Sequence, residues 1–105
     1  MLINVTEDTF EQEVINSDIP VLVDFWAAWC GPCRVQGEII DAFSKELKEG
    51  EAKICKVDVD TNPNLSFEHQ IMSIPTLMAY KDGKLIAREV GVRNEAKLRE
   101  MLNLS

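Results

Sequence analysis

Cys30 and Cys33 are two thiols separated only by Gly31 and Pro32, at the point where an apolar segment ends and a helical pattern begins. At this spacing on a first helical turn, the two side chains occupy neighbouring positions of one face, so they can close a small disulfide ring and reopen it. A thiol at a helix N-terminus meets unpaired backbone N–H groups and the positive end of the helix dipole. Both favour the thiolate, which is the form that attacks disulfides. The pattern therefore predicts a redox-active pair.

A zinc site is the alternative interpretation of this spacing, because zinc sites also use cysteines two residues apart. Cys55 and His69 would complete a set of three cysteines and one histidine. Cys55, however, alternates with apolar residues in a predicted inner strand, and His69 lies on a separate short helix. Nothing else in the sequence brings the four together. We therefore expect redox chemistry without a metal, Cys55 as an inert core thiol, and His69 in contact with solvent.

Asp24 is the least expected residue for its position, because it lies inside the apolar segment Val21–Trp26. Such a segment is typical of a strand covered on both faces. An ionised carboxylate is costly to bury, and burial raises its pKa. The alternative is a strand edge that faces water, but the apolar residues on both sides argue against it. We expect a buried Asp24 with a raised pKa.

The elements that must position these residues follow from the hydrophobic pattern. The segments with the pattern of strands are residues 2–5, 21–26, 53–59, 76–80 and 85–90. In the third of these, Cys55, Val57 and Val59 alternate onto one face. The last two flank the segment 81–84, whose Asp-Gly pair predicts a hairpin turn.

Helical patterns occupy most of the remaining chain. They lie after Thr6 or Asp8, from residues 30–33 to 49, over residues 62–70, and after Asn94. The first places Phe10 and Val14 on its inner face, and the last is expected to be capped by Asn94. In the long second helix an apolar residue recurs every four positions, and Gly50 is placed to end it. The inner faces predicted for the second and last helices are Val35, Ile39, Phe43 and Leu47, and Leu98, Met101 and Leu102.

The order of elements is βαβαβαββα, which predicts the α/β class. Strands that alternate with helices imply parallel pairing, and the hairpin adds an antiparallel edge, so the central sheet should be mixed. The chain has 105 residues, 46% of them hydrophobic. That is enough for one core, and we expect a single domain over residues 1–105.

Composition limits the partners and the compartment. The chain carries 11 Lys and Arg against 18 Asp and Glu, for a net charge of −7. Such a chain is repelled by phosphate backbones, so we expect no nucleic-acid partner. No run approaches the roughly 20 apolar residues that span a bilayer, and the first residues do not have the pattern of a secretory signal. We expect no membrane partner and a cytoplasmic protein.

The sequence resembles the thioredoxin family over essentially its whole length. The resemblance is carried by the segment Trp29-Cys30-Gly31-Pro32-Cys33, with Asp24 in the strand before it and Lys56 in the next predicted strand. Three further matches follow along the chain: Ile74-Pro75-Thr76, Asp82-Gly83 and Gly91. A pair of cysteines at this spacing is weak evidence alone, but the combination is specific.

The resemblance implies a fold and a set of roles. The thioredoxin fold is a mixed central β-sheet covered by helices on both faces. Cys30 would be the exposed attacking thiol and Cys33 the buried resolving thiol, while Asp24 exchanges protons with Cys33 and Lys56 lies near Asp24. The bond between Ile74 and Pro75 would be cis. The implied substrate groove consists of Trp29, Gly31, Pro32, Ile74, Pro75, Gly91 and Val92.

The implied activity is that of a general protein disulfide reductase, a thiol-disulfide oxidoreductase that works through a mixed disulfide. No bound cofactor is implied. A flavin- and NADPH-dependent thioredoxin reductase would regenerate the dithiol of a monomeric protein, and the substrates would be disulfide-containing proteins. The alternative is a redox-switched binding subunit that uses the same groove. The intact pair with Asp24 favours turnover, because binding alone requires neither thiol.

The sequence departs from the usual family pattern at a few positions. Glu38, preceded by Gly37, stands where family members commonly have a proline that kinks the helix. Ser73 stands where a glycine is frequent, Met72 where a basic residue is frequent, and Arg34 replaces the common lysine. We expect these changes to affect partner choice and the pKa values of the motif, but not the thiol chemistry.

Overall fold

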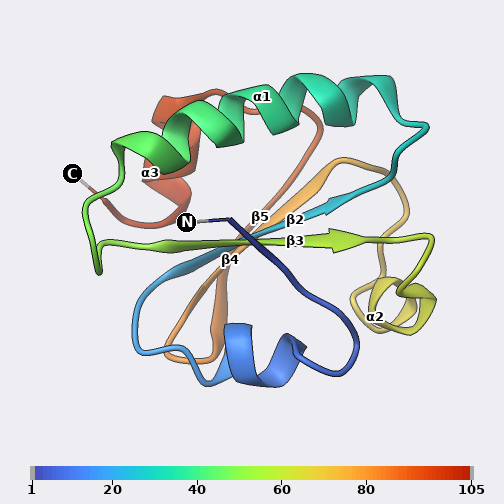
Figure 1. Cartoon of the computed structure of the whole chain (residues 1–105), viewed down its shortest axis with the longest axis horizontal. Coiled ribbons are helices and arrows are strands. Elements are labelled where there is room, and N and C mark those ends of the chain that lie inside the picture. The colour runs from blue at the N-terminus through green and yellow to red at the C-terminus, as the bar shows by residue number, and fades with distance from the viewer. Residues whose placement is uncertain (1, 105) are drawn as a thin grey trace.

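A five-stranded sheet forms the centre of the computed structural model, which describes residues 2–104. Met1 and Ser105, the two ends of the predicted domain 1–105, lie outside the described residues. The elements, labelled in Figure 1, are β1 (Leu2–Asn4), η1 (Glu11–Ile15), β2 (Val21–Trp26), α1 (Gly31–Glu46), β3 (Lys53–Asp58), α2 (Pro63–Glu68), β4 (Thr76–Lys81), β5 (Lys84–Val90) and α3 (Glu95–Met101).

The strand order is β1-β3-β2-β4-β5, and the pairing is mixed as predicted. β3 pairs in parallel with both β1 and β2, whereas β4 pairs antiparallel with β2 and with β5. β2 therefore lies in the middle of the sheet with a partner on each side. In its register with β3, Asp24 lies opposite Lys56.

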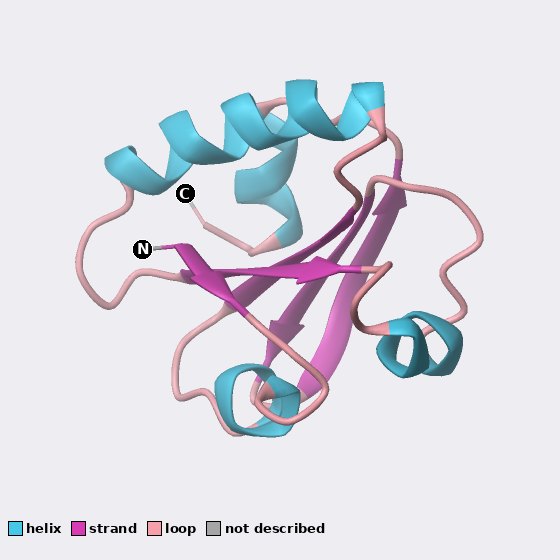
Figure 2. Ribbon diagram, turned by 45° about the vertical axis from the view of Figure 1, so that its right-hand side comes forward, coloured by secondary structure: helices cyan, strands magenta, loops and turns pink. Residues whose placement is uncertain are grey.

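Helices cover both faces of the sheet, which confirms the predicted fold class. α1 and α3 lie on one face, and η1 and α2 lie on the other (Figures 1 and 2). Successive side chains of a strand point to opposite faces. In β2, Val23 and Phe25 therefore join the core beneath η1 and α2, while Leu22 joins the core beneath α1 and α3. Asp24, two residues after Leu22, lies on the α1 side.

The buried face of α1 differs from the predicted stripe. Val35 is 50% exposed, and the helix ends at Glu46 rather than at residue 49. The helix continues through Gly37 and Glu38, the positions that depart from the family pattern. Phe43 of the predicted stripe is buried, and Ile39 and Leu47 are partly buried, so only Val35 was placed wrongly. The stripe also missed Gln36, because an apolar pattern cannot show a buried polar position. The buried residues of α1 are Cys33, Gln36, Ile40 and Phe43.

The first helical segment also differs from its prediction. It is a short π-helix, η1, whose own N-cap residue Phe10 makes no side-chain cap. Thr6 caps the turn that leads into it: its hydroxyl oxygen accepts the Asp8 N–H at 3.3 Å, and its carbonyl oxygen accepts the N–H groups of Thr9 and Phe10. The predicted inner residues Phe10 and Val14 are both buried.

Two local predictions near the C-terminus are confirmed. The turn between β4 and β5 has positive φ at both Asp82 (52°) and Gly83 (77°), as the tight hairpin turn requires. The Asn94 side chain accepts the Lys97 N–H at 2.9 Å and so caps α3. Leu98, Met101 and Leu102 of this last helix are buried as expected.

Candidate functional site

The two cysteines lie at the N-terminus of α1, directly after the central strand of the sheet. Cys30 is the N-cap residue, and its sulfur accepts the Cys33 N–H at 3.2 Å. Pro32 suits this place because its fixed φ fits the first helical turn and its missing N–H has no partner there to lose. Cys30 and Cys33 are joined in a disulfide. The predicted pairing is therefore present.

Both cysteines are nearly buried in this disulfide form, with 4% of each exposed. The exposed position expected for Cys30 does not hold here, because the pair packs against Ala27 and the partly buried Ile74. The two residues nevertheless line different hollows. Cys30 lines a groove of about 440 Å³, while Cys33 lines a smaller hollow of about 210 Å³ together with Lys56.

The groove beside Cys30 contains part of the predicted substrate groove. Four of the residues that the resemblance implied line it: Trp29, Gly31, Pro32 and Ile74. The other three lie outside it, since Pro75 is buried and Val92 lines a separate hollow of about 400 Å³. Gly91 is nevertheless held next to this region, because its N–H donates to the Pro75 carbonyl at 2.8 Å.

Sequence reasoning missed several residues of the groove. These are Val59, Ser66 and Ile71; two further lining residues, Met72 and Ser73, were noted from the sequence only as departures expected to affect partner choice. Val59 follows β3, which runs parallel to β2, so it lies at the same end of the sheet as the cysteines and this placement could have indicated it. Residues 71–73 directly precede Ile74 in the chain. Ser66 belongs to α2, and no local signal indicated that this helix reaches the groove.

Trp29 presents a large apolar surface beside the disulfide. It is 70% exposed, and its indole N–H donates to Asp60 Oδ2 at 2.9 Å. This hydrogen bond fixes the ring while leaving most of it in solvent. An exposed aromatic side chain with a defined orientation is well suited to contact a protein partner.

The peptide bond between Ile74 and Pro75 is cis, as the resemblance implied. The carbonyl oxygen of Ile74 lies 3.8 Å from the Cys30 sulfur. The segment before Pro75 therefore brings polar backbone next to the reactive pair. Backbone groups in this place can pair with an extended segment of another protein.

Asp24 is completely buried, which confirms the prediction from the sequence. Neither of its carboxylate oxygens has a hydrogen-bond partner among residues 2–104. Burial raises the pKa of Asp24 to about 6, and the opposing charge of Lys56 limits the rise. A carboxyl group with this pKa can take up or release a proton at a pH close to neutral.

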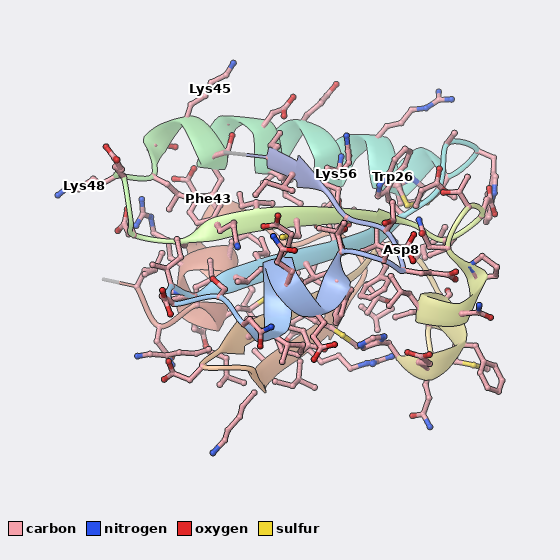
Figure 3. The ribbon with its side chains drawn as sticks, turned by 60° about the horizontal axis from the view of Figure 1, so that its bottom comes forward. Asp8, Trp26, Phe43, Lys45, Lys48 and Lys56 are labelled. Atoms are coloured by element: carbon pink, nitrogen blue, oxygen red, sulfur yellow. A yellow bond between two sulfur atoms is a disulfide. The ribbon has the colours of Figure 1, made fainter. Side chains whose placement is uncertain are left out.

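Lys56 lines the hollow beside Cys33, and its charge acts on the buried carboxyl group of Asp24. Its ammonium nitrogen is 5.1 Å from the centre of the Trp26 ring, and the two labelled side chains lie close together in Figure 3. A cation over an aromatic face is stabilised by the ring quadrupole. A Cβ at Gly37 would be 3.7 Å from the same nitrogen, an ordinary contact distance, so Gly37 of α1 lies directly beside Lys56. The site thus combines one buried acid, one cation and the cysteine pair.

Neither of the two further residues considered for zinc, Cys55 and His69, is placed as a metal ligand would be. Cys55 is fully buried beneath η1 and α2, and burial raises the pKa of its thiol to about 11. His69 was expected in solvent, but it is partly buried, with its ring 4.8 Å from Phe10 and 5.6 Å from Phe25. Within residues 2–104, no three side chains of His, Cys, Asp or Glu are grouped to hold a metal ion.

Comparison with known proteins identifies the family of this chain. The family model described as thioredoxin matches residues 1–104. The chain is 48% identical to a thioredoxin of Rickettsia felis over 102 residues, which cover 97% of this chain and 96% of the relative. It is 46% identical to a thioredoxin of Porphyra purpurea, with 94% and 92% covered, and 46% identical to thioredoxin 1 of a Nostoc species, with 93% and 91% covered. None of the helices within residues 2–104 is both long and apolar enough to cross a membrane. With the Cys30–Cys33 disulfide at the start of α1, these matches show that the chain belongs to the thioredoxin family.

Proposed function

We propose that this chain reduces disulfide bonds of other proteins, with Cys30 as the attacking thiol and Cys33 as the resolving thiol. Its membership of the thioredoxin family makes it a thiol-disulfide oxidoreductase whose redox group is its own cysteine pair. The observation that carries the proposal is the disulfide at the N-terminus of α1, at the edge of an apolar groove. This position supplies both an activated sulfur and a surface for a partner.

The first step forms a mixed disulfide. The Cys30 thiolate attacks one sulfur of the substrate disulfide, a new S–S bond forms, and the other substrate sulfur leaves with the electron pair. Two features support Cys30 in this role: it lines the groove, and its sulfur accepts the Cys33 N–H at the positive end of the α1 dipole. The groove gives a substrate access to Cys30, while the hydrogen bond and the helix dipole stabilise negative charge on the attacking sulfur.

The second step releases the reduced substrate. Cys33 loses its proton and attacks the Cys30 sulfur, which closes the protein disulfide and expels the second substrate sulfur as a thiolate. Overall, the substrate disulfide is reduced to two thiols while the protein dithiol is oxidised. We assign the proton of Cys33 to Asp24, directly or through water. The support is a buried carboxyl group with a pKa of about 6 on the sheet face that α1 covers.

Lys56 and the groove complete the proposal. Lys56 lines the hollow beside Cys33 and lowers the pKa of Asp24, so it would keep the carboxylate available as a base at neutral pH. The substrate chain would lie along Trp29, Gly31, Pro32 and Ile74, next to the backbone of Pro75, Gly91 and Val92. The exposed ring of Trp29 supports this placement.

The partners belong to the same proposal. Because each turnover leaves the protein oxidised, an external reductase must return two electrons. We assign this to a thioredoxin reductase that uses flavin and NADPH. We place the reaction in the cytoplasm, where thiols are mostly kept reduced, and we infer a monomer formed by one domain. The net charge of −7 is compatible with protein substrates rather than nucleic acid.

Insulin reduction with dithiothreitol tests the function directly. The parent should accelerate precipitation of the insulin B chain, and Cys30→Ser should abolish this because no attacking thiolate remains. Cys33→Ser should instead accumulate mixed disulfides, visible by mass spectrometry. Cys55→Val is the matched control for the loss of one thiol, and it should retain turnover because Cys55 is buried with a pKa of about 11. Full activity of Cys30→Ser would contradict the proposal.

A further inference from the structure

Gln36 is a polar side chain that is completely buried in the helix carrying the reactive cysteines. It lies three residues after Cys33, on the same face of α1. Burying a polar group costs free energy unless it is hydrogen-bonded, so the hydrogen-bond partners of Gln36 indicate its role. Both ends of its amide pair with the backbone of Arg93. The Nε2–H donates to the Arg93 carbonyl oxygen at 3.0 Å, and Oε1 accepts the Arg93 N–H at 2.7 Å.

The backbone held by Gln36 leads directly to the reactive pair. Arg93 ends the segment 91–93, whose first residue, Gly91, donates its N–H to the Pro75 carbonyl at 2.8 Å. Pro75 in turn follows Ile74, whose carbonyl oxygen lies 3.8 Å from the Cys30 sulfur. These contacts form a closed path. It runs from α1 through the Gln36 amide, across the segment 91–93, and back to Cys30 at the start of the same helix.

The side chain of Arg93 anchors the segment at its outer side. Its Nε–H donates to Glu89 Oε1 at 3.1 Å, and one Nη–H donates to the Val92 carbonyl at 3.1 Å. These groups are partly exposed and contribute little free energy on their own. The Gln36 amide is therefore the buried contact that ties the segment to α1.

We propose that Gln36 is a positioning residue for disulfide exchange, which holds the segment 91–93 against Pro75 so that the backbone beside Cys30 is fixed to receive a protein substrate. The proposal rests on the proposed reduction of protein disulfides. An apolar side chain would fill the same space, but it would leave the Arg93 N–H and carbonyl oxygen without their partners. The segment would then be held only by the Gly91 N–H and the partly exposed Arg93 side chain, so it would move more, and docking of an extended chain would have to order it again.

Two substitutions separate the hydrogen bonds of Gln36 from its volume. Gln36→Met has a similar length and no amide, so it should raise the KM for insulin by about five- to tenfold, the factor expected for one or two lost hydrogen bonds. The kcat should stay unchanged. The rate with a small aromatic disulfide should also stay unchanged, since such a molecule needs no ordered segment. Gln36→Glu keeps the length and replaces the amide with a carboxyl group.

The pH profile of Gln36→Glu provides a signature that loss of stability alone cannot produce. A protonated carboxyl group can donate to the Arg93 carbonyl and accept the Arg93 N–H, as the amide does, whereas the carboxylate cannot donate. Burial raises the pKa of a carboxyl group. The KM of this variant relative to the parent should therefore fall towards one as the pH is lowered from 8 to 6. This variant also tests the proposal if Gln36→Met does not fold.

Hydrogen exchange and a matched control complete the experiment. The Arg93 amide should exchange faster in Gln36→Met, because its acceptor is removed. Ile40→Val, one turn further along the same buried face of α1, should lower the unfolding temperature without changing the KM. An unchanged KM in folded Gln36→Met, or an equal loss with insulin and the small disulfide, would overturn the positioning role. A parent that fails to reduce insulin would instead refute the proposed function.

Discussion

Burial of the Asp24 carboxyl group lowers the stability of the folded protein but provides a titratable group in its interior. The carboxyl group lies fully buried, and neither oxygen has a hydrogen-bond partner among residues 2–104. Burial raises its pKa from the ordinary value of 3.8 to about 6. The folded protein therefore retains a proton between these values that the unfolded chain has already released. Stability falls as the pH rises through this range, and the full penalty is present above the folded pKa.

Asp24→Asn should remove this penalty. At pH 7 the variant should be more stable than the parent by about 2 kcal/mol, because a shift of about two pKa units corresponds to roughly 3 kcal/mol and the buried amide also lacks partners. The difference should shrink as the pH falls from 6 to 4. Urea titrations across this range measure it. Rapid-mixing kinetics should show a slower release of substrate from the mixed disulfide, because Cys33 has lost its proton acceptor.

Asp18→Asn provides the control for Asp24. Asp18 is exposed on the surface, so its replacement removes one negative charge and leaves the buried carboxyl group of Asp24 in place. Its pH dependence of stability should follow that of the parent between pH 4 and 7. If Asp24→Asn also follows the parent, the buried carboxyl does not titrate as described, and its proton-transfer role loses its basis.

At the scale of elements, the end of α2 directs the chain into the groove. The helix closes with the Ile71 N–H bonded to the Ser66 carbonyl at 2.9 Å and the Gln70 N–H bonded to the Phe67 carbonyl at 3.1 Å. This arrangement places Gln70 in the left-handed region, with φ at 53°. The chain then continues through Ile71, which lines the groove.

A side chain from β5 strengthens this helix end. The Arg88 guanidinium donates to the carbonyl oxygens of His69 and Gln70, each at 2.8 Å. A cation at a helix C-terminus also interacts favourably with the helix dipole. The strand at the edge of the sheet thus supports the groove wall formed by the residues before Ile74.

Gln70→Gly should stabilise the protein. A side chain in the left-handed region costs roughly 1–2 kcal/mol, part of which glycine loses again through its greater freedom in the unfolded chain. We expect a net gain of about 0.5–1 kcal/mol in the free energy of unfolding, measured by urea denaturation. Gln70→Ala is the matched control, because it removes the same side-chain atoms beyond Cβ but keeps the unfavourable φ. Equal stabilities of the two variants would contradict this explanation.

At the scale of the whole molecule, the sheet joins two apolar layers into one structure. Residues of β2 contribute to the core under η1 and α2 and to the core under α1 and α3. If one layer unfolded, one face of β2 would be exposed to water. The other layer packs against the opposite face of the same strand and would lose its support. We therefore infer that the two layers fold and unfold together, as expected for a single domain.

Equilibrium unfolding tests this inference. Tryptophan fluorescence, which reports on Trp26 and Trp29 near the site, and far-ultraviolet circular dichroism, which reports on all elements, should give the same urea midpoint. The measurement should be made on the oxidised protein, so that the cysteine pair does not change during the titration. Two separate transitions would show that the layers unfold independently and that the chain does not behave as one cooperative domain.

The sequence by itself determined the features that depend on neighbouring residues. The hairpin turn at Asp82 and Gly83, the cap at Asn94 and the helix start at Gly31 and Pro32 each follow from backbone angles or hydrogen bonds within a few positions. The apolar run around Asp24 was also sufficient to predict its burial, because a strand with apolar residues on both faces has no side in water. The order of strands and helices then indicated the mixed sheet.

Only the tertiary structure decided which distant residues meet. The buried face of α1 depends on the Arg93 backbone, which satisfies Gln36, and the near burial of Cys30 depends on packing against Ile74. His69 packs on Phe10 for the same kind of reason. The groove combines the start of α1, part of α2 and the segment before Pro75. The periodicity of one segment indicates which of its side chains can face the core and which can face water. It does not report which groups of another element will pair with them, because that is set by strand register and by contacts between elements far apart in the chain.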